Sequence, residues 1–177
     1  HEQITLYDDP TIANGYGSTL FDAEGTPTQK TNIIEKGILK NYLHNASTAK
    51  RYKTKSTGNA GLISPRAFSP VLQGGDHSKE ELFKEVKKGI YITNVWYTRF
   101  QNHETGDFST IPRDGAFYIE NGKIKYPLKD IRISENMLKL MKNISALGKE
   151  STQIKSWEVE IPTTVPYTLV KNVNITK

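Results

Sequence analysis

The chain has 177 residues, 36% of them hydrophobic, a formal net charge of +5 and no cysteine. The length suits one domain with a packed core, and the lack of cysteine excludes disulfides, thiol catalysis and every zinc site that needs a Cys ligand. No run approaches the roughly 18 apolar residues of a membrane helix, so we expect a cytoplasmic protein without membrane contact. The first residue is His1, and we expect a processed product or a piece of a longer protein.

The first half of the chain predicts short strands joined by loops. Glycines within Asn14–Thr19 and Ser56–Gly61 mark loops, because glycine adopts backbone conformations that regular structure does not use. The remaining residues favour a strand, a hairpin with its turn at Lys36-Gly37, a short helix and a further strand. In chain order these elements are Gln3–Tyr7, Thr28–Leu43, Asn45–Tyr52 and Phe68–Leu72.

The second half predicts two well-marked helices. Ser78 and Glu81 have the spacing of a capping box, so a helix is expected to begin at Ser78 and to end at Gly89. Apolar residues at helical spacing favour another helix from Ser134 to Gly148.

Strands are expected around these helices. Asn121-Gly122 is the strongest turn signal and predicts a hairpin over Gly115–Tyr126. The other expected strands are Ile90–Tyr97, Ile131–Ile133 and Tyr167–Ile175, with residues 149–166 irregular. Together these elements predict a single α+β domain over residues 1–177, with a largely antiparallel or mixed β-sheet and two or three helices.

The sequence contains no complete catalytic or metal-binding motif. His103-Glu104 resembles the start of a zincin motif, but Asp107 stands where the second histidine belongs, and Gly106 disfavours a helix there. No Gly-x-Ser-x-Gly element surrounds a serine. We therefore predict no catalytic residue, no metal ligand and no cofactor in this chain.

The densest basic run is Lys50–Lys55, in which four cations accompany Tyr52. Such a run is compatible with binding to the phosphate backbone of a nucleic acid. Its plainer interpretation is the solvated face of a short helix and the loop that follows. A nucleic-acid-binding module and a purely structural dimerisation domain are the two alternative functions.

Three polar loops that contain glycine supply the candidate binding residues. Such loops can present backbone N–H and C=O groups to a peptide or to another subunit, although they also suit tight turns. The candidate peptide-binding residues are Gly17, Ser18, Thr19, Ser56, Thr57, Gly58, Thr105, Gly106, Asp107, Phe108 and Ser109.

Several segments resemble those of a known family in their amino-acid residues and in their order along the chain. They are Tyr16–Thr19, Phe21–Gly25, Thr28-Gln29, Lys36-Gly37, Ser56–Gly61, Gly89–Thr93, Thr105–Ser109 and Ile119–Ile124. In this order they resemble the C-terminal half of the TldD/PmbA family, and the resemblance runs from about Ile4 to Ile175.

The resemblance implies a cytosolic peptide-processing pair. This chain would associate with a TldD-like or PmbA-like partner subunit, or with a second copy, and the substrate would be an unfolded peptide. In TldD-like members the zinc ligands come from a His-Glu-x-x-x-His helix N-terminal to this region and from a cysteine in a Cys-Gly-Lys-x-Gly-Gln segment. Here Lys149–Gln153 follows the last predicted helix, and no cysteine follows it. The resemblance is therefore to the PmbA-like branch, and Asp107–Gly115 suggests an archaeal-type member.

These points give one expectation for function. We expect the C-terminal domain of a TldD/PmbA-type complex, without the N-terminal half, that acts in subunit assembly and peptide binding and has no peptidase activity alone. Zinc would belong to the full-length protein or its partner. If the N-terminal half carries the zinc helix, His103 and His44 are the first candidates for a further ligand. The peptide is expected to bind by strand addition.

Overall fold

At the two strongest turn signals the chain reverses between paired strands. Lys36 and Gly37 have φ values of 48° and 76°, and Asn121 and Gly122 have φ values of 50° and 74°. Left-handed conformations at both central residues give the turn whose twist matches that of paired strands. Both predicted hairpins are therefore confirmed. Their strands are β2 (Thr31–Glu35) with β3 (Ile38–Leu39), and β8 (Ala116–Glu120) with β9 (Lys123–Pro127).

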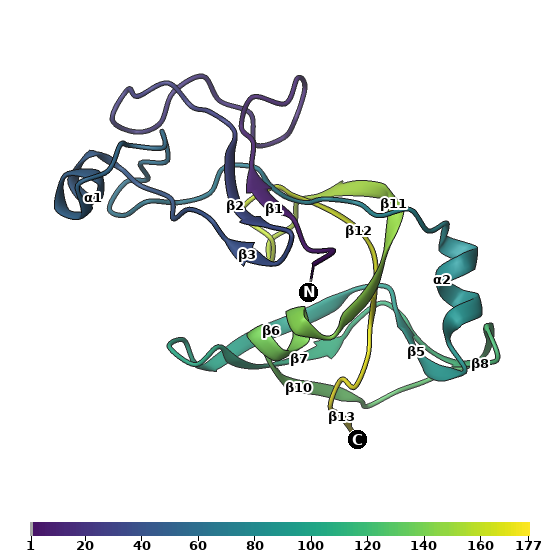
Figure 1. The fold of residues 1–177 in the computed structure, drawn as a ribbon. Helices are drawn as coiled ribbons and strands as arrows, with labels where there is room; N and C mark the ends of the chain where they lie inside the picture. Colours follow the sequence, from purple (N-terminus) through teal and green to yellow (C-terminus); the bar gives the residue numbers. More distant parts are fainter. Residues whose placement is uncertain (1) are drawn as a thin grey trace. The chain divides into compact units, whose positions relative to one another are not determined.

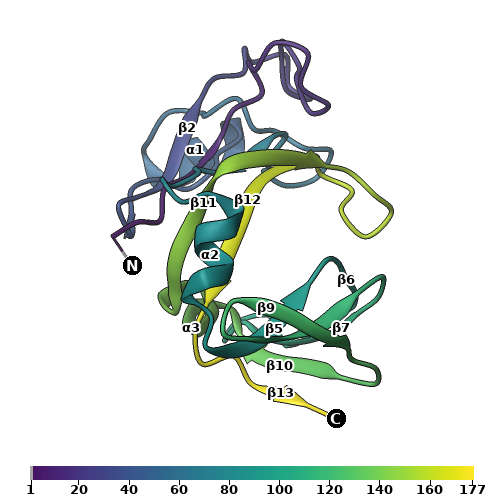
Figure 2. The ribbon, with the colours of Figure 1, turned by 90° about the vertical axis from the view of Figure 1, so that its right-hand side faces the viewer.

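The structure is a computed structural model that describes residues 2–177, and the chain divides into two units (Figure 1). The loop-rich unit holds residues 2–74 and 151–166, and the two-sheet unit holds residues 75–150 and 167–177. Strands β11 (Ile144–Ile154) and β12 (Thr163–Val170) lie side by side (Figure 1, Figure 2). Each of these two strands passes from one unit into the other.

The sheet of the loop-rich unit is mixed. The strand order is β11-β12-β4-β1-β2-β3, in which β1 is Leu6–Asp8 and β4 is Pro70–Leu72. Strand β1 pairs antiparallel with β2 and β4, and the β12–β4 pair is parallel. The predicted short helix is confirmed as α1 (Ala46–Tyr52). It begins at Asn45, whose side chain accepts from the N–H of Thr48 in a capping box.

A buried carboxylate joins the segments of the loop-rich unit. Asp8 lies at the end of β1 with no exposed surface, and its Oδ1 accepts from the N–H groups of Phe68 (3.0 Å) and Ser69 (2.7 Å). Its Oδ2 accepts from the side-chain amide of Asn59 at 2.6 Å, and that amide also donates to the carbonyl of Arg66. Burial raises the pKa of Asp8, and these hydrogen bonds oppose the rise.

A second buried carboxylate organises the loops of the same unit. Asp22 accepts hydrogen bonds from the N–H groups of Glu24, Thr26 and Ala60, each at 2.9 Å. The N–H of Ala23 donates in turn to the carbonyl of Ala60 at 3.1 Å. We call these bonds the Asp22 clasp, because they fasten two loops that are distant in sequence.

The two-sheet unit contains a four-stranded sheet, β13-β10-β7-β6, and a three-stranded sheet, β5-β8-β9. Every strand pair in both sheets is antiparallel. The bounds are β5 Lys88–Ile92, β6 Val95–Asn102, β7 Asp107–Pro112, β10 Arg132–Asn136 and β13 Ile175–Thr176.

The helix predicted from the capping box is α2 (Lys79–Glu85). The Oγ of Ser78 accepts from the N–H of Glu81, and the N–H of Ser78 donates to the Glu81 carboxylate. Only the end of the helix was predicted wrongly. Val86 adopts an extended conformation and stops the helix, and Gly89 lies in β5.

The predicted strand Ile90–Tyr97 is in fact split between two strands. The chain turns at Thr93 and Asn94, where the N–H of Thr93 donates to the carbonyl of Gly115. Strand β5 then pairs with β8, whereas β6 pairs with β7 in the other sheet. A continuous run of apolar and β-branched residues does not reveal such a turn.

The helix predicted over Ser134–Gly148 is wrong for most of its length. Helix α3 spans only Met137–Lys142, and its N-cap is Asn136. From Ile144 the chain belongs to β11. The apolar spacing that favoured a helix serves a strand here, because Ile144, Ala146 and Leu147 are all buried in that strand.

Gly148 therefore ends no helix. Its carbonyl accepts from the N–H of Gly75, and a Cβ at position 148 would lie 3.3 Å from the Cβ of Tyr167 on β12. The glycine leaves room for close approach of the two strands. Residues 149–166 are also more regular than predicted, since β11 continues to Ile154 and β12 begins at Thr163.

The terminal strand predicted over Tyr167–Ile175 corresponds to the end of β12 and the start of β13, with a break between them. The described residues 2–177 contain three helices beside antiparallel and mixed sheets, so the α+β class is confirmed. None of these helices is long and apolar enough to cross a membrane.

Replacement of Asp8 by Ala is expected to lower the free energy of unfolding by about 3–5 kcal/mol, since each buried donor left without a partner costs about 1–3 kcal/mol. Urea unfolding followed by circular dichroism measures the change. Asp9→Ala is the matched control, because the Asp9 carboxylate accepts from the N–H and the hydroxyl of Thr11 in an exposed setting. A loss no larger than that of the control would contradict the central role of Asp8.

Candidate functional site

Two of the three predicted loops meet in the loop-rich unit. Gly17 packs on the backbone of Phe68, where an added Cβ would lie 2.1 Å from the carbonyl oxygen. Gly58 packs in the same way on Pro27, and the Oγ1 of the next residue, Thr28, donates to the carbonyl of Thr19. The segment at Pro27 and Thr28 thus lies between the first loop and the second.

The hydroxyl groups of these loops bond within the chain. The N–H of His44 donates to the Oγ1 of Thr57 at 2.8 Å, and the Oγ of Ser56 donates to the carbonyl of His44 at 3.2 Å. The Oγ of Ser18 donates to the carbonyl of Ile12. Ser18 and Ser56 therefore hold the loop geometry.

Thr57 also lines an open groove of about 640 Å³ in the loop-rich unit. The other lining residues come mainly from β1, β2 and the turns beside them. They are Thr5, Tyr7, Gln29, Lys30, Thr31, Asn32, Glu35, Lys36, Asn41 and Gln73. Hydroxyl and amide side chains dominate this lining, and we call it the amide groove.

One aromatic ring lies in the amide groove. The ammonium group of Lys30 stands 3.8 Å from the centroid of the Tyr7 ring, a favourable cation–π geometry. The side-chain amide of Asn41 donates to the carbonyl of Asn32 at 2.7 Å. Sequence reasoning missed the groove apart from Thr57. The period-two spacing of Thr5 and Tyr7 in the predicted strand Gln3–Tyr7 was the available signal.

The third predicted loop belongs to the two-sheet unit and is mostly not a loop. Thr105 and Gly106 form the turn between β6 and β7, whereas Asp107, Phe108 and Ser109 lie in β7 itself. Phe108 and Ser109 are buried. The Oγ of Ser109 accepts from Gln101 and Arg132, at 2.9 and 3.2 Å, so it takes part in pairing within the sheet.

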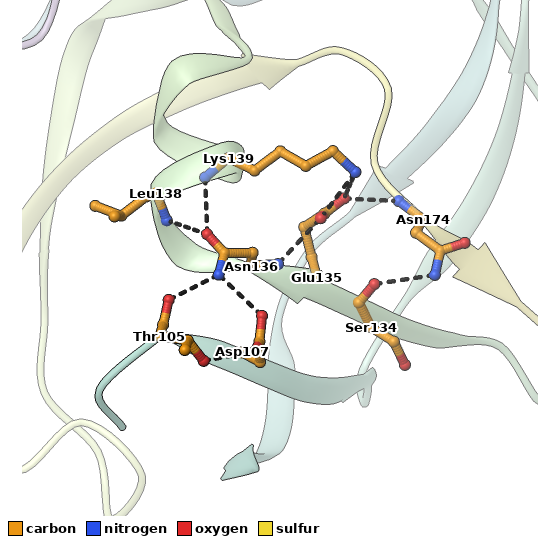
Figure 3. A network of polar contacts seen from close by, with 8 residues as sticks. All are labelled: Thr105, Asp107, Ser134, Glu135, Asn136, Leu138, Lys139 and Asn174. Atoms are coloured by element: carbon orange, nitrogen blue, oxygen red, sulfur yellow. Dashed lines mark hydrogen bonds and ion pairs between the residues drawn. The ribbon is translucent and has the colours of Figure 1, made fainter. Parts of the chain in front are cut away.

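The turn is fastened to the start of α3 by Asn136, as Figure 3 shows. The Asn136 amide donates to the carbonyl of Thr105 at 2.7 Å and to the carboxylate of Asp107 at 2.9 Å. Its Oδ1 accepts from the N–H groups of Leu138 and Lys139, which caps the helix. Hydrogen bonds from Asn136 and then Thr105 lower the pKa of Asp107.

Glu135 supplies a second connection in this network (Figure 3). Burial favours the neutral acid, but donors from the Asn136 N–H, the Lys139 ammonium and the Asn174 N–H outweigh it and lower the pKa of Glu135. Lys139 lies 3.0 Å from the carboxylate. Strand β10, helix α3 and the chain before β13 are joined by this one side chain, which points to a structural role.

The residues present do not fit a zinc site. Within residues 2–177 no group of three or more His, Cys, Asp or Glu side chains could hold a metal ion. Three histidines have other contacts: His44 with Thr48, His77 with Glu85, and His103 stacked on Phe100. His1 lies outside the described residues.

The basic run is exposed at the end of α1. Lys50 and Arg51 occupy the last helical turn, where cations complement the helix dipole, and Lys53 is the left-handed C-cap. Tyr52 packs against His44, with ring centroids 5.9 Å apart. Helix termination accounts for the cations at Lys50, Arg51 and Lys53.

Comparison with known proteins gives one consistent family. A family model for the PmbA/TldA metallopeptidase C-terminal domain matches residues 1–177. The chain is 37% identical over 158 residues to metalloprotease MJ0996 of Methanocaldococcus jannaschii, covering 84% of this chain and 34% of that protein. It is 34% identical over 148 residues to metalloprotease PmbA of Escherichia coli O157:H7, covering 83% and 31%.

Solved structures agree with this result. TldE from Thermococcus kodakarensis superimposes with a TM-score of 0.87 at 30% identity, covering 99% of this chain and 40% of that one. A proposed modulator of a DNA gyrase from Thermotoga maritima gives a TM-score of 0.89 at 33% identity, covering 99% and 40%. The chain therefore spans about a third of the length of the curated relatives it matches.

Replacement of Asn136 by Ala is expected to raise the pKa of Asp107 toward the ordinary value of 3.8, because the lost amide stabilises the carboxylate. Loss of the helix cap should also lower the free energy of unfolding by about 1 kcal/mol. NMR titration of the Asp107 carboxyl carbon measures the pKa. Asn174→Ala is the control, since its side-chain amide donates to the carbonyl of Ser134 and not to Asp107. An unchanged titration in Asn136→Ala would refute the assignment.

Proposed function

The chain belongs to the PmbA/TldD family as its C-terminal domain, and on this premise we propose that it binds unfolded peptide and joins a second subunit in a peptide-processing complex of the cytoplasm. The relatives carry the name metalloprotease, and this chain corresponds to about a third of their length. Because its residues do not fit a zinc site, the proposed role is to hold a peptide rather than to cleave it.

The amide groove is the observation that carries peptide binding. An extended peptide presents a regular series of N–H and C=O groups, and amide and hydroxyl side chains can donate to or accept from both kinds. Such contacts recognise the main chain and tolerate any side chain. Gln29, Gln73 and Thr57 line the groove from three separate segments, which suits a peptide that crosses several of them.

The sheet edge beside the groove supports strand addition. Strand β3 ends the six-stranded sheet and pairs with β2 alone. Glu35, Lys36 and Asn41, which flank β3 along the chain, all line the amide groove. A peptide on this edge would extend the sheet by main-chain hydrogen bonds and place its side chains beside the groove.

An exposed apolar tip supports subunit assembly. Leu62 and Ile63 are 96% and 92% exposed, and they stand in a tight turn closed by the N–H of Gly61 and the carbonyl of Ser64 at 3.0 Å. Adjacent large apolar side chains with this exposure are characteristic of interaction surfaces.

Hydrogen bonds fix the backbone on which the tip stands. The Asp22 clasp fixes Ala60, the residue before the turn, and an added Cβ at Gly61 would lie 2.6 Å from the carbonyl of Ser64. Leu20 and Phe21, which directly precede Asp22, are exposed as well. A pre-organised apolar anchor loses little freedom on binding, so the partner we propose is a second subunit of the same family, a second copy being the simplest case.

Replacement of both Gln29 and Gln73 by Ala is expected to weaken binding of an unfolded peptide about 30-fold, since each of the two lost hydrogen bonds contributes about 1 kcal/mol. Fluorescence anisotropy of a labelled, casein-derived unfolded peptide measures the affinity. Lys125→Ala, on the exposed strand β9, is the control. Equal affinity of the double variant and the wild type would remove the groove from the proposal.

The double change Leu62→Ser and Ile63→Ser is expected to weaken self-association by about 2 kcal/mol, or roughly 30-fold, as for a central interface anchor. Sedimentation velocity over a range of concentrations measures the association. Tyr52→Ser removes an exposed large side chain elsewhere in the same unit and should leave association unchanged. A wild-type chain that stays monomeric at every concentration would argue against assembly of two copies through this tip.

A further inference from the structure

The charged side chains that line the amide groove do not balance one another. They are Lys30, Glu35 and Lys36. The Glu35 carboxylate lies 4.0 Å from the ammonium group of Lys40, which is not among the lining residues. Within residues 2–177 neither Lys30 nor Lys36 has a carboxylate at ion-pair distance. The groove therefore offers two cations to a ligand, whereas its carboxylate already has a partner.

The first cation is held in place by an aromatic ring. The ammonium group of Lys30 stands 3.8 Å from the centroid of the Tyr7 ring. Tyr7 lies on β1 and pairs with Asn32 of β2, so the sheet fixes the backbone that carries the ring. A ring face covers one side of an ammonium group, which has three donors. The remaining donors can bind a carboxylate, and their prior placement reduces the entropy lost on binding.

The second cation stands at the opposite end of β2. The N–H of Lys36 donates to the Oγ1 of Thr5 at 3.3 Å, which fastens the hairpin turn to the chain at β1. Lys30 directly precedes β2 and Lys36 directly follows it. The length of this strand, about 17 Å at the usual rise per residue, therefore separates the two backbone positions. The lysines thus offer two separate contacts.

We propose that the amide groove selects unfolded peptides that carry acidic side chains, and that Lys30 and Lys36 determine this specificity. The inference rests on the proposed function, namely that peptide binds in this groove. The amide and hydroxyl groups of the lining recognise the main chain, and the two lysines add a preference among side chains. An Asp or Glu side chain of the peptide gains an ion pair, whereas a basic side chain is repelled.

The separation of the two cations predicts a spacing of the acidic residues. An extended peptide has the same rise per residue as β2, and its side chains lie on one face when they are an even number of residues apart. Lys30 and Lys36 are six positions apart in the chain. Two acidic side chains about six residues apart can therefore contact both lysines, whereas adjacent acidic side chains point to opposite faces.

The test compares labelled unfolded peptides of Gly, Ser and Gln by fluorescence anisotropy. In the acidic peptide two glutamines with the predicted spacing are replaced by glutamate. At low salt we expect this peptide to bind about tenfold more tightly than the parent, since each exposed ion pair contributes about threefold. Higher salt should reduce the difference by screening. A peptide with two adjacent glutamates has the same charge and should bind less tightly than the spaced one.

Variants of the cations test their part. Lys30→Met and Lys36→Met should each lower the preference for the acidic peptide about threefold, and the double variant should abolish it without weakening the parent peptide. Lys30→Arg should retain the preference, because a guanidinium group keeps the charge and packs on a ring. Lys50→Met is the control, since it removes an exposed cation of α1 that does not line the groove. Circular dichroism confirms that each variant is folded.

The outcomes separate this inference from the function on which it rests. If neither peptide binds, the proposed function itself is refuted. If the acidic and parent peptides bind equally, peptide binding stands and the specificity is overturned. A preference that persists in the folded double variant would also overturn the role of the two lysines. So would a labelled single-stranded oligonucleotide that binds more tightly than the acidic peptide and is lost in the double variant, because the cations would then serve nucleic acid.

Discussion

The carboxylate of Asp8 is the constraint on which the loop-rich unit depends. It is buried, and its stability there rests on two backbone N–H groups and the amide of Asn59. These bonds fix β1 against Asn59, which follows the Ser56–Gly58 loop, and against Phe68, on whose backbone Gly17 packs. Strand β1 in turn pairs with β2 and β4. Because residues of β1 and β2 line the amide groove, Asp8 helps to position that lining.

Buried polar side chains hold distant segments of this unit together, a role that apolar packing has in most domains. Asp8, Asp22 and Asn59 are all buried and each bonds across a long sequence separation. Such a scaffold needs few large apolar residues, which agrees with a hydrophobic fraction of only 36%. It also leaves apolar side chains such as Leu62 and Ile63 on the surface, beside residues that hydrogen bonds hold in place.

Elements that depend on neighbouring residues were predicted correctly, whereas elements that depend on pairing with distant segments were not. The hairpin turns and the capping box at Ser78 depend on neighbouring residues alone, and they were right. The stretch from Ile144 to Leu147 has apolar spacing that suits a helix, yet it forms a strand because the segment at Gly75 pairs with it. Of the residues that line the amide groove, Thr57 was predicted as a candidate from its loop, whereas Tyr7 and Lys30 become neighbours only after folding.

The path of β11 and β12 has a consequence for how this chain can be divided. The chain passes between the two units at residues 74–75, 150–151 and 166–167, so neither unit is a continuous stretch of sequence. A single proteolytic cut, or a simple truncation, cannot release either one intact. To obtain the loop-rich unit by itself, an engineer would have to join residue 74 to residue 151 through a new connection.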